Sequence, residues 1–190
     1  MTATYERMIV FEAAFNFRDL GGFQTRDGYQ VRWRKAFRSA ALHDMTPADV
    51  LTARELGLRS VFDLRSPREL EEDGVGVLYE GGWATHRHTP FFQDVSGSVP
   101  RDLNIEMVAL YKQMLVNAQP AIGQVFSELA DGETYPALFH CAAGKDRTGV
   151  ISALVLRTLN VDDATIAADY ALSTEYITPR LEALRTAKSI

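Results

Sequence analysis

The sequence has little cysteine, no long apolar run and no excess of positive charge, and each absence narrows what the chain can do. Its 190 residues include one cysteine, so no disulfide can form within the chain. No stretch approaches the roughly 20 apolar residues that a membrane span requires, so no integral membrane contact is expected. The formal net charge of -5 makes nucleic acid a poor candidate partner.

The first residues also lack a basic segment followed by an apolar core, which is the pattern of a classical signal peptide. Together with the single cysteine, this absence leads us to expect a cytoplasmic location. What is present is an ordinary globular composition, with 46% hydrophobic and 24% charged residues. Because repeats and low-complexity tracts are also lacking, the sequence predicts a single domain over residues 1–190.

The chain is organised around ten residues, HCAAGKDRTG at 140–149. A short apolar run at 136–139 precedes them and favours a buried strand, and the run at 150–156 favours a buried helix. A strand, a tight loop and a helix in succession point the loop N–H groups and the positive end of the helix dipole at one place, which binds anions. The pattern therefore predicts a phosphate-binding loop that Cys141 opens and Arg147 closes.

The residue types of this loop suit a covalent reaction at phosphorus. Cys141 would act as a thiolate nucleophile, a form that a helix N-terminus and nearby cations stabilise. Arg147 would bind two phosphoryl oxygens at once through its planar guanidinium. Gly144 would let successive N–H groups face inward, and the Thr148 hydroxyl would donate to the thiolate. The predicted phosphate-binding residues are Ala142, Ala143, Gly144, Lys145, Asp146, Arg147 and Thr148.

The same residues resemble a known family. The loop is similar to the Cys-x5-Arg-Ser/Thr signature of cysteine-dependent phosphatases, and its Lys145–Asp146 pair resembles the broad-specificity tyrosine phosphatases of bacteria and fungi. Segments at 16–22, 37–40 and 61–66 are similar to that family in the same order. The resemblance implies hydrolysis of phosphotyrosyl proteins or phosphoinositides. Because phosphoryl transfer needs mainly positioning and charge stabilisation, which the loop N–H groups and Arg147 would supply, we expect no cofactor and no metal. Lys145 is then a candidate to meet additional phosphates of a phosphoinositide head group.

Four aspartates are candidates for the general acid that protonates the leaving oxygen. Asp146 is favoured because it lies inside the loop, where the resemblance places an acid, and because the Trp-Pro-Asp triplet of many cysteine phosphatases is absent. Asp63 stands at the end of a predicted parallel strand, where ligands bind in α/β sheets, but it could instead cap a helix or pair with Arg65. Asp94 and Asp102 lie near a segment that forms a lid in the family.

The predicted fold is α/β: a mostly parallel, twisted sheet of four or five strands flanked by helices, in a cysteine-phosphatase-like single domain. Residues 58–64 and 83–90 read as two of the strands, and Asp27-Gly28 as the turn of a hairpin. Thr46 and Pro47 are typical of the start of a helix. Residues 165–172 and 174–184 read as two separate helices.

Two smaller patterns involve charged or titratable side chains. Arg18 and Asp19 are adjacent and could form a buried ion pair close to the site. His86 and His88 share one face of a predicted strand, but a metal site normally needs three or four protein ligands, so we expect no metal there.

Two other function classes remain open from the residues alone. A phosphate-binding module without catalysis would not need both Cys141 and Arg147, which are intact. An arsenate reductase could use the same loop, but such enzymes commonly need further cysteines to resolve their intermediate, and this chain has none.

Overall fold

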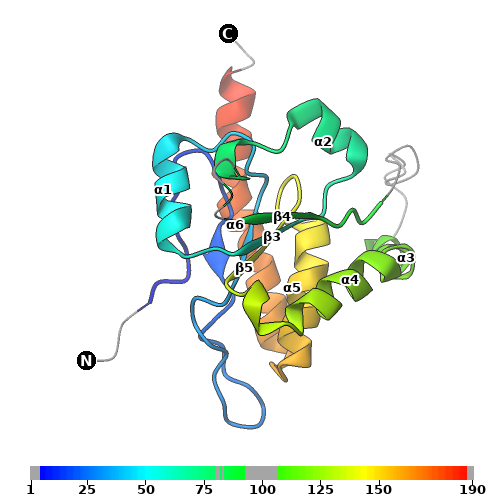
Figure 1. Cartoon of the computed structure of the whole chain (residues 1–190). Coiled ribbons are helices and arrows are strands. Elements are labelled where there is room, and N and C mark those ends of the chain that lie inside the picture. Colours follow the sequence, from blue (N-terminus) through cyan, green and yellow to red (C-terminus); the bar gives the residue numbers. More distant parts are fainter. Residues whose placement is uncertain (1–4, 80–81, 83, 93–106, 188–190) are drawn as a thin grey trace.

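The computed structural model describes residues 5–79, 82, 84–92 and 107–187. In these residues the core is one sheet with the strand order β1-β2-β5-β3-β4 (Figure 1). The strands β2, β5, β3 and β4 are parallel, and β1 is an antiparallel edge. The strands are β1 (Arg18–Asp19), β2 (Ala36–Ser39), β3 (Ser60–Asp63), β4 (Thr85–His88) and β5 (Ala137–His140). The predicted mostly parallel sheet is confirmed.

Helices cover both faces of the sheet. On one side lie α1 and the 3-10 turn η1, and on the other lie α3, α4 and α5, with α6 packed against α5 (Figure 1). The helices are α1 (Pro47–Glu55), α2 (Pro67–Asp73), α3 (Met107–Asn117), α4 (Gln119–Leu129), α5 (Asp146–Thr158) and α6 (Asp163–Ala187), with short turns η1 (Val77–Tyr79) and η3 (Gly132–Thr134).

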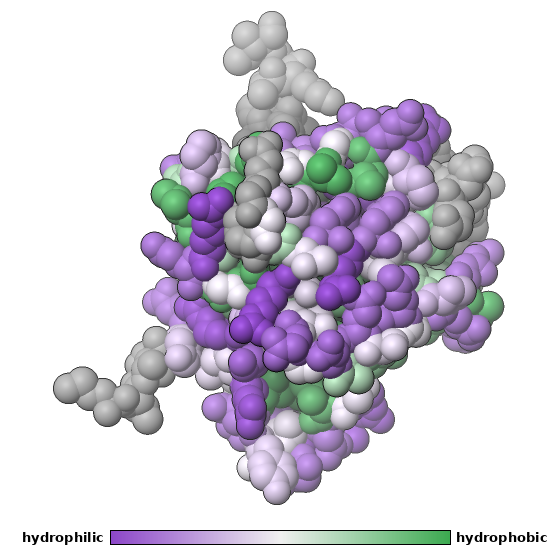
Figure 2. Space-filling model, viewed as in Figure 1, coloured by the Kyte–Doolittle hydropathy of each residue, from purple (hydrophilic) through white to green (hydrophobic). Residues whose placement is uncertain are grey.

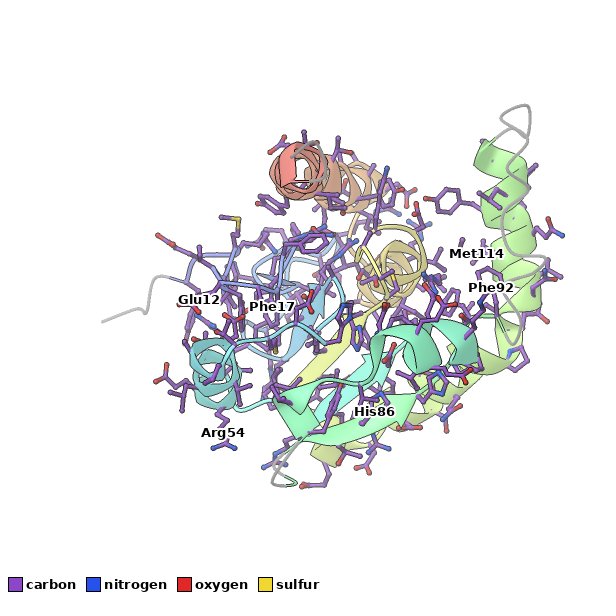
Figure 3. The ribbon with its side chains drawn as sticks, turned by 90° about the horizontal axis from the view of Figure 1, so that it is seen from above. Glu12, Phe17, Arg54, His86, Phe92 and Met114 are labelled. Carbon is purple, nitrogen blue, oxygen red and sulfur yellow. The ribbon has the colours of Figure 1, made fainter. Side chains whose placement is uncertain are left out.

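The alternation of side chains along the strands produces two hydrophobic clusters. Phe37, Val61 and Leu138 lie side by side in register and face α1. Phe62 and Phe139 are their neighbours on the opposite face, with ring centroids 5.5 Å apart. Figure 3 shows the two sides of the sheet. Phe17 lies on the side of α1, and Phe92 lies on the other side together with Met114, which belongs to α3. Because both faces are covered, every residue of β2, β3 and β5 is buried, polar residues included.

Capping boxes define where α1 and α2 begin. The Thr46 hydroxyl accepts a hydrogen bond from the N–H of Asp49, and the Asp49 carboxylate accepts one from the N–H of Thr46. The predicted helix start at Thr46 is confirmed. Ser66 and Glu69 make the same box at α2, so Ser66 caps this helix and Asp63 does not.

The two helices predicted after the loop are a single helix, α6. The two predicted ranges leave out Ser173, and a serine hydroxyl can bond to the local backbone and interrupt a helix. In the structure its buried hydroxyl accepts instead from Arg18 at 3.0 Å and from Arg38 at 3.3 Å. The Ser173 hydroxyl is therefore bound by arginines of β1 and β2 and does not interrupt the helix.

The predicted ion pair between Arg18 and Asp19 is also wrong, although both side chains are buried. Arg18 pairs with Asp169 on α6, at 2.9 Å. Asp19 accepts the N–H groups of Gly21 and Arg34. The reason is geometric, since successive residues of a strand point to opposite faces.

The hairpin predicted at Asp27-Gly28 is present in the structure. Gln24 pairs with Gln30 across a turn in which Gly28 has φ +87°, so the hairpin is confirmed. The face seen in Figure 2 is mainly hydrophilic with scattered apolar side chains. Among the described residues, none of the helices has both the length and the hydropathy needed to span a membrane.

Candidate active site

The loop that follows His140 lies at the carboxyl end of the central strand β5. The parallel strands β2 and β3 flank β5, so Ser39, His140 and Asp63 stand in one row where the three strands end. Ligands of parallel α/β sheets bind outside this end of the strands. The helix α5 begins at Asp146 and directs its N-terminus at the same place.

The carbonyl groups of the loop are bonded to residues outside it. The Ala142 oxygen accepts the N–H of Ala41 at 3.0 Å. Asn16 Nδ2 donates to the oxygens of Ala143 and Gly144, at 3.1 and 3.0 Å. In the described part of the chain, no acceptor lies within hydrogen-bonding distance of the N–H groups of residues 142–148. With the carbonyls held on the outer side, these N–H groups can bind an anion on the inner side.

Gly144 is required by both its conformation and its neighbours. Its φ is +65°, a region that L side chains rarely adopt. A Cβ atom on this residue would lie 2.3 Å from the Ser39 oxygen and 2.6 Å from the Ala40 nitrogen. Both contacts are with backbone of the strand β2 and the residue after it, so a side chain here would push the loop away from the sheet.

Gly144→Ala is expected to lower the free energy of unfolding by about 2–6 kcal/mol, since backbone strain and overpacking each cost about 1–3 kcal/mol. Gly57→Ala is the matched control, because Gly57 has φ +68° with nothing within 4 Å of the added Cβ. That control should cost about 1–2 kcal/mol from conformation alone. Urea unfolding measures both. Equal losses in the two variants would show that the close approach of Gly144 to β2 has no energetic role.

Arg147 is held by Glu69, a residue that the sequence interpretation did not single out. Its Nη1 and Nη2 donate to the two Glu69 oxygens at 2.5 and 2.7 Å. Burial opposes the charge of Glu69, but the hydrogen bonds from Arg147 and Ser66 outweigh it and lower the Glu69 pKa to about 2. A guanidinium has five N–H donors, so this end-on pair leaves Nε–H and a second Nη2–H for two phosphoryl oxygens. The capping box Ser66-x-x-Glu69 was the available sequence signal.

The carboxylate of Asp146 contacts two tyrosine hydroxyls. The Tyr111 hydroxyl on α3 donates to its Oδ1, and the Tyr170 hydroxyl on α6 lies 3.2 Å from the same atom. Burial raises the pKa of both tyrosines, and the Asp146 charge adds to this rise, so both remain protonated donors at neutral pH. Nothing in the sequence pattern connects the three residues.

Two buried arginines lie beneath the loop. Arg38 Nη2 donates to the Gly144 oxygen at 2.9 Å, and its Nη1 pairs with Asp169 at 2.7 Å. Arg18 pairs with the other oxygen of Asp169. Burial, and then the neighbouring Arg18, lower the Arg38 pKa to about 10, so it stays charged at neutral pH. Two cations and one carboxylate leave a net positive charge under the loop.

Cys141 and Thr148 are both buried at the centre of the site. The Thr148 hydroxyl has no hydrogen-bond partner among the described residues. A buried hydroxyl without a protein acceptor is able to donate to a nearby thiolate, as the sequence suggested. That contact with Cys141 stays a prediction.

Asp63 stands at the end of β3 as expected, and neighbouring side chains bind its carboxylate. The side chain is fully buried. Its carboxylate accepts hydrogen bonds from Nε and Nη2 of Arg65, at 3.0 and 2.7 Å, and lies 3.3 Å from His86 Nε2. Although burial opposes its charge, His140, His86 and Arg65 keep the Asp63 pKa well below its ordinary value. The geometry does not support Asp63 as a group that touches substrate. Pairing with Arg65, the alternative considered above, is what the structure has.

Lys145, the two remaining candidate acids and the two histidines complete the residues singled out from the sequence. Lys145 is half-buried, and within the described ranges no carboxylate lies at salt-bridge distance from its ammonium, so it is not a partner of Asp63. The candidates Asp94 and Asp102 lie outside the described residues. His86 and His88 stack with ring centroids 6.2 Å apart, and the described residues contain no group of three metal-ligating side chains.

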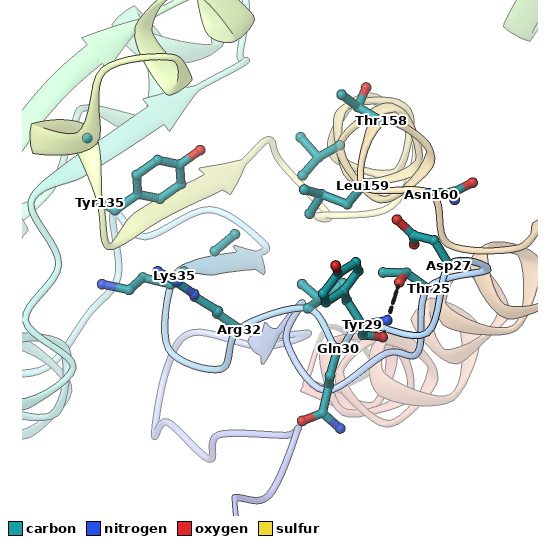
Figure 4. Close-up of a pocket in the computed structure, with 14 residues that line it drawn as sticks. Thr25, Asp27, Tyr29, Gln30, Arg32, Lys35, Tyr135, Thr158, Leu159 and Asn160 are labelled. Atoms are coloured by element: carbon teal, nitrogen blue, oxygen red, sulfur yellow. Dashed lines mark hydrogen bonds between the residues drawn. The ribbon is translucent and has the colours of Figure 1, made fainter.

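A separate pocket of about 700 Å³ lies at the other end of α5 (Figure 4). It is formed by the hairpin, the residues before β5 and the last turn of α5, including Tyr29, Tyr135 and Leu159. The 13 residues of α5 rise about 20 Å, so this pocket is not part of the catalytic loop.

Comparison with known proteins agrees with this site. The chain matches the sequence profile of the Tyrosine phosphatase family over residues 9–189. It is 32% identical over 204 residues to the triple specificity protein phosphatase PtpB of Mycobacterium tuberculosis, covering 90% of this chain and 70% of PtpB. A Cupriavidus necator protein named as a candidate tyrosine-protein phosphatase is 32% identical over 174 residues, covering 88% of this chain and 63% of that protein. The chain thus spans about two thirds of the length of these relatives.

Solved structures with weaker similarity include kinase associated phosphatase, with a TM-score of 0.45 and 14% identity over 73% of this chain and 74% of that one. The family profile, in contrast, covers nearly the whole chain and includes the loop from Cys141 to Arg147. The chain belongs to the tyrosine phosphatase family.

Proposed function

We propose that this chain hydrolyses phosphomonoesters through a cysteinyl-phosphate intermediate, with phosphotyrosyl proteins as its main substrates. The observation that carries the proposal is the loop itself. Its carbonyls are bonded outward by Asn16, Arg38 and Ala41, which leaves its N–H groups for the phosphoryl oxygens beside Cys141. Membership of the tyrosine phosphatase family supports the same reaction.

The first step transfers the phosphoryl group to sulfur. The Cys141 thiolate attacks phosphorus, the P–S bond forms and the bond from phosphorus to the leaving oxygen breaks. Asp146 gives its proton to that oxygen, so the product leaves as an alcohol or phenol. The loop N–H groups and the free donors of Arg147 stabilise the charge on the three equatorial oxygens.

The second step returns the enzyme to its starting state. The Asp146 carboxylate takes a proton from water, the oxygen of that water attacks phosphorus, and the S–P bond breaks. Inorganic phosphate and the Cys141 thiolate are released. The donors and the acid present in this chain supply the charge stabilisation and the proton for both steps, so we propose a reaction without a cofactor.

Phosphoinositides are proposed as a second substrate class. Lys145 is half-buried on the loop and has no carboxylate partner among the described residues, so its charge can meet a further phosphate of a head group. The relative PtpB is named a triple specificity phosphatase, which agrees with a broad range.

A substrate panel tests the proposal. The full chain is expected to release phosphate from aryl phosphate and phosphotyrosyl peptide, with undiminished turnover in the presence of a chelator and with a phosphoryl group trapped on Cys141 by acid quench and mass spectrometry. Binding of phosphotyrosine without release would instead indicate a phosphate-binding module. Reduction of arsenate without phosphate release would indicate an arsenate reductase, and loss of turnover with chelator would overturn the metal-independent mechanism.

A further inference from the structure

Two tyrosines on different helices meet one carboxylate oxygen of the catalytic loop. The hydroxyls of Tyr111 and Tyr170 both contact Oδ1 of Asp146, and the two hydroxyl oxygens are 2.5 Å apart. Their rings meet edge to face, with centroids 6.3 Å apart. The three residues lie on α3, α6 and α5, so the packing of three helices brings them together.

The protons of this cluster can be counted. Three oxygens, one carboxylate and two phenolic, share two phenolic protons, since an ionised carboxylate only accepts. Tyr111 donates to Asp146, and Tyr170 donates either to Asp146 or to the Tyr111 oxygen. In both arrangements Oδ1 is engaged, whereas Oδ2 receives no hydrogen bond from the described residues. A general acid carries its proton on the oxygen that faces the leaving group, and Oδ2 is the oxygen left for that task.

Because Gly149 has no side chain, the Tyr170 ring can pack directly against the backbone of α5. A Cβ atom on Gly149 would lie 2.9 Å from two carbons of the Tyr170 ring. Gly149 is three residues after Asp146, on the same face of the helix. The ring therefore lies directly against α5 below the carboxylate, which fixes where its hydroxyl can be.

We infer that Tyr111 and Tyr170 are positioning residues for the general acid, which hold Asp146 by Oδ1 so that Oδ2 is directed at the leaving oxygen. This inference rests on the proposed function, in which Asp146 protonates the leaving group. The competing interpretation is that the hydroxyls only tie α3 and α6 to α5. The two interpretations differ in how the rate depends on the leaving group.

The experiment compares Tyr111→Phe and Tyr170→Phe on two substrates, p-nitrophenyl phosphate and phosphotyrosyl peptide. The nitrophenolate leaves with little need of a proton, whereas the tyrosyl oxygen needs one. Each variant is expected to slow the peptide reaction about 10-fold, a part of the 10²–10⁴ that a general acid contributes, and to change the nitrophenyl reaction less than about threefold. In an Asp146→Asn background the same changes should have no further effect on this selectivity, because residues that act as a unit are not additive.

Tyr135→Phe is the matched control. Its hydroxyl is also half-buried and donates to a main-chain oxygen, that of Leu129, at 2.9 Å, away from the loop. Gly149→Ala is a second probe that keeps both hydroxyls but displaces the Tyr170 ring, and it should show the same selective loss.

Equal slowing of both substrates, or no slowing, in variants that unfold at the same temperature as Tyr135→Phe would overturn the positioning role. Absence of phosphatase turnover in the unmodified chain would instead refute the proposed function. The two failures are thus distinguishable.

Discussion

Cys141→Ser is expected to lower the turnover of aryl phosphates on the order of 10⁶-fold, as when another covalent enzyme loses its nucleophile. The buried thiol lies at the start of the loop, above a net positive charge from Arg18, Arg38 and Asp169 and at the N-terminus of α5. A thiolate is a strong nucleophile, whereas a serine hydroxyl keeps its proton at neutral pH and attacks phosphorus poorly. Steady-state kinetics on p-nitrophenyl phosphate measure the loss.

The control for this variant is binding. Because the loop N–H groups and Arg147 are unchanged, Cys141→Ser should still bind a phosphotyrosyl peptide and should unfold at a similar urea concentration. Calorimetric titration and urea unfolding report on these two properties. Turnover within tenfold of the parent would mean that sulfur is not the nucleophile, and the covalent mechanism would be abandoned.

The loop was the most predictable part of the site because its chemistry is contiguous. Cys141, Gly144 and Arg147 lie within seven positions of each other, and the strand and helix that flank them have strong apolar runs. Local sequence is enough in such a case, since the geometry of a strand, a tight turn and a helix follows from neighbouring residues alone. The sheet was predictable for a similar reason, through the buried runs of β3 and β5.

The partners of the loop were not predictable, because they come from distant parts of the chain. Glu69 precedes Arg147 by 78 positions, and Asn16 precedes Gly144 by 128. Tyr111 and Tyr170 reach Asp146 only after α3 and α6 have packed against α5. The Ser66-x-x-Glu69 capping box marks the start of α2, but the sequence carries no signal that Glu69 pairs with Arg147, and none for the contacts of Asn16, Tyr111 and Tyr170.

Asp63 shows how a correct position can leave the contacts of a side chain open. Its place at the end of β3 was right, but the residue two positions later, Arg65, folds back and takes both carboxylate oxygens. A contact between residues i and i+2 at the end of a strand depends on how the chain turns there. In this chain the turn leads directly into α2, which Ser66 caps. The sequence pattern therefore placed Asp63 at the edge of the site without showing which way it points.

Asp146→Asn is expected to slow hydrolysis of tyrosyl and alkyl phosphates by about 10²–10⁴ and to spare p-nitrophenyl phosphate, because only the former need a proton on the leaving oxygen. An asparagine can still accept the Tyr111 hydrogen bond through its amide oxygen, so the loop geometry should be kept. The ratio of kcat/KM between the two substrate types is the measurement, with unfolding in urea as the check on structure.

The competing acid is Asp94, and the same ratio decides between them. Asp146 lies at the first position of α5, five residues after Cys141, and its Oδ2 receives no hydrogen bond from the described residues. Arg147, the next residue, is itself paired with Glu69. If Asp94→Asn produced the selective loss while Asp146→Asn slowed every leaving group equally, then Asp146 would be an element of loop structure, and Tyr111 and Tyr170 would have no acid to position.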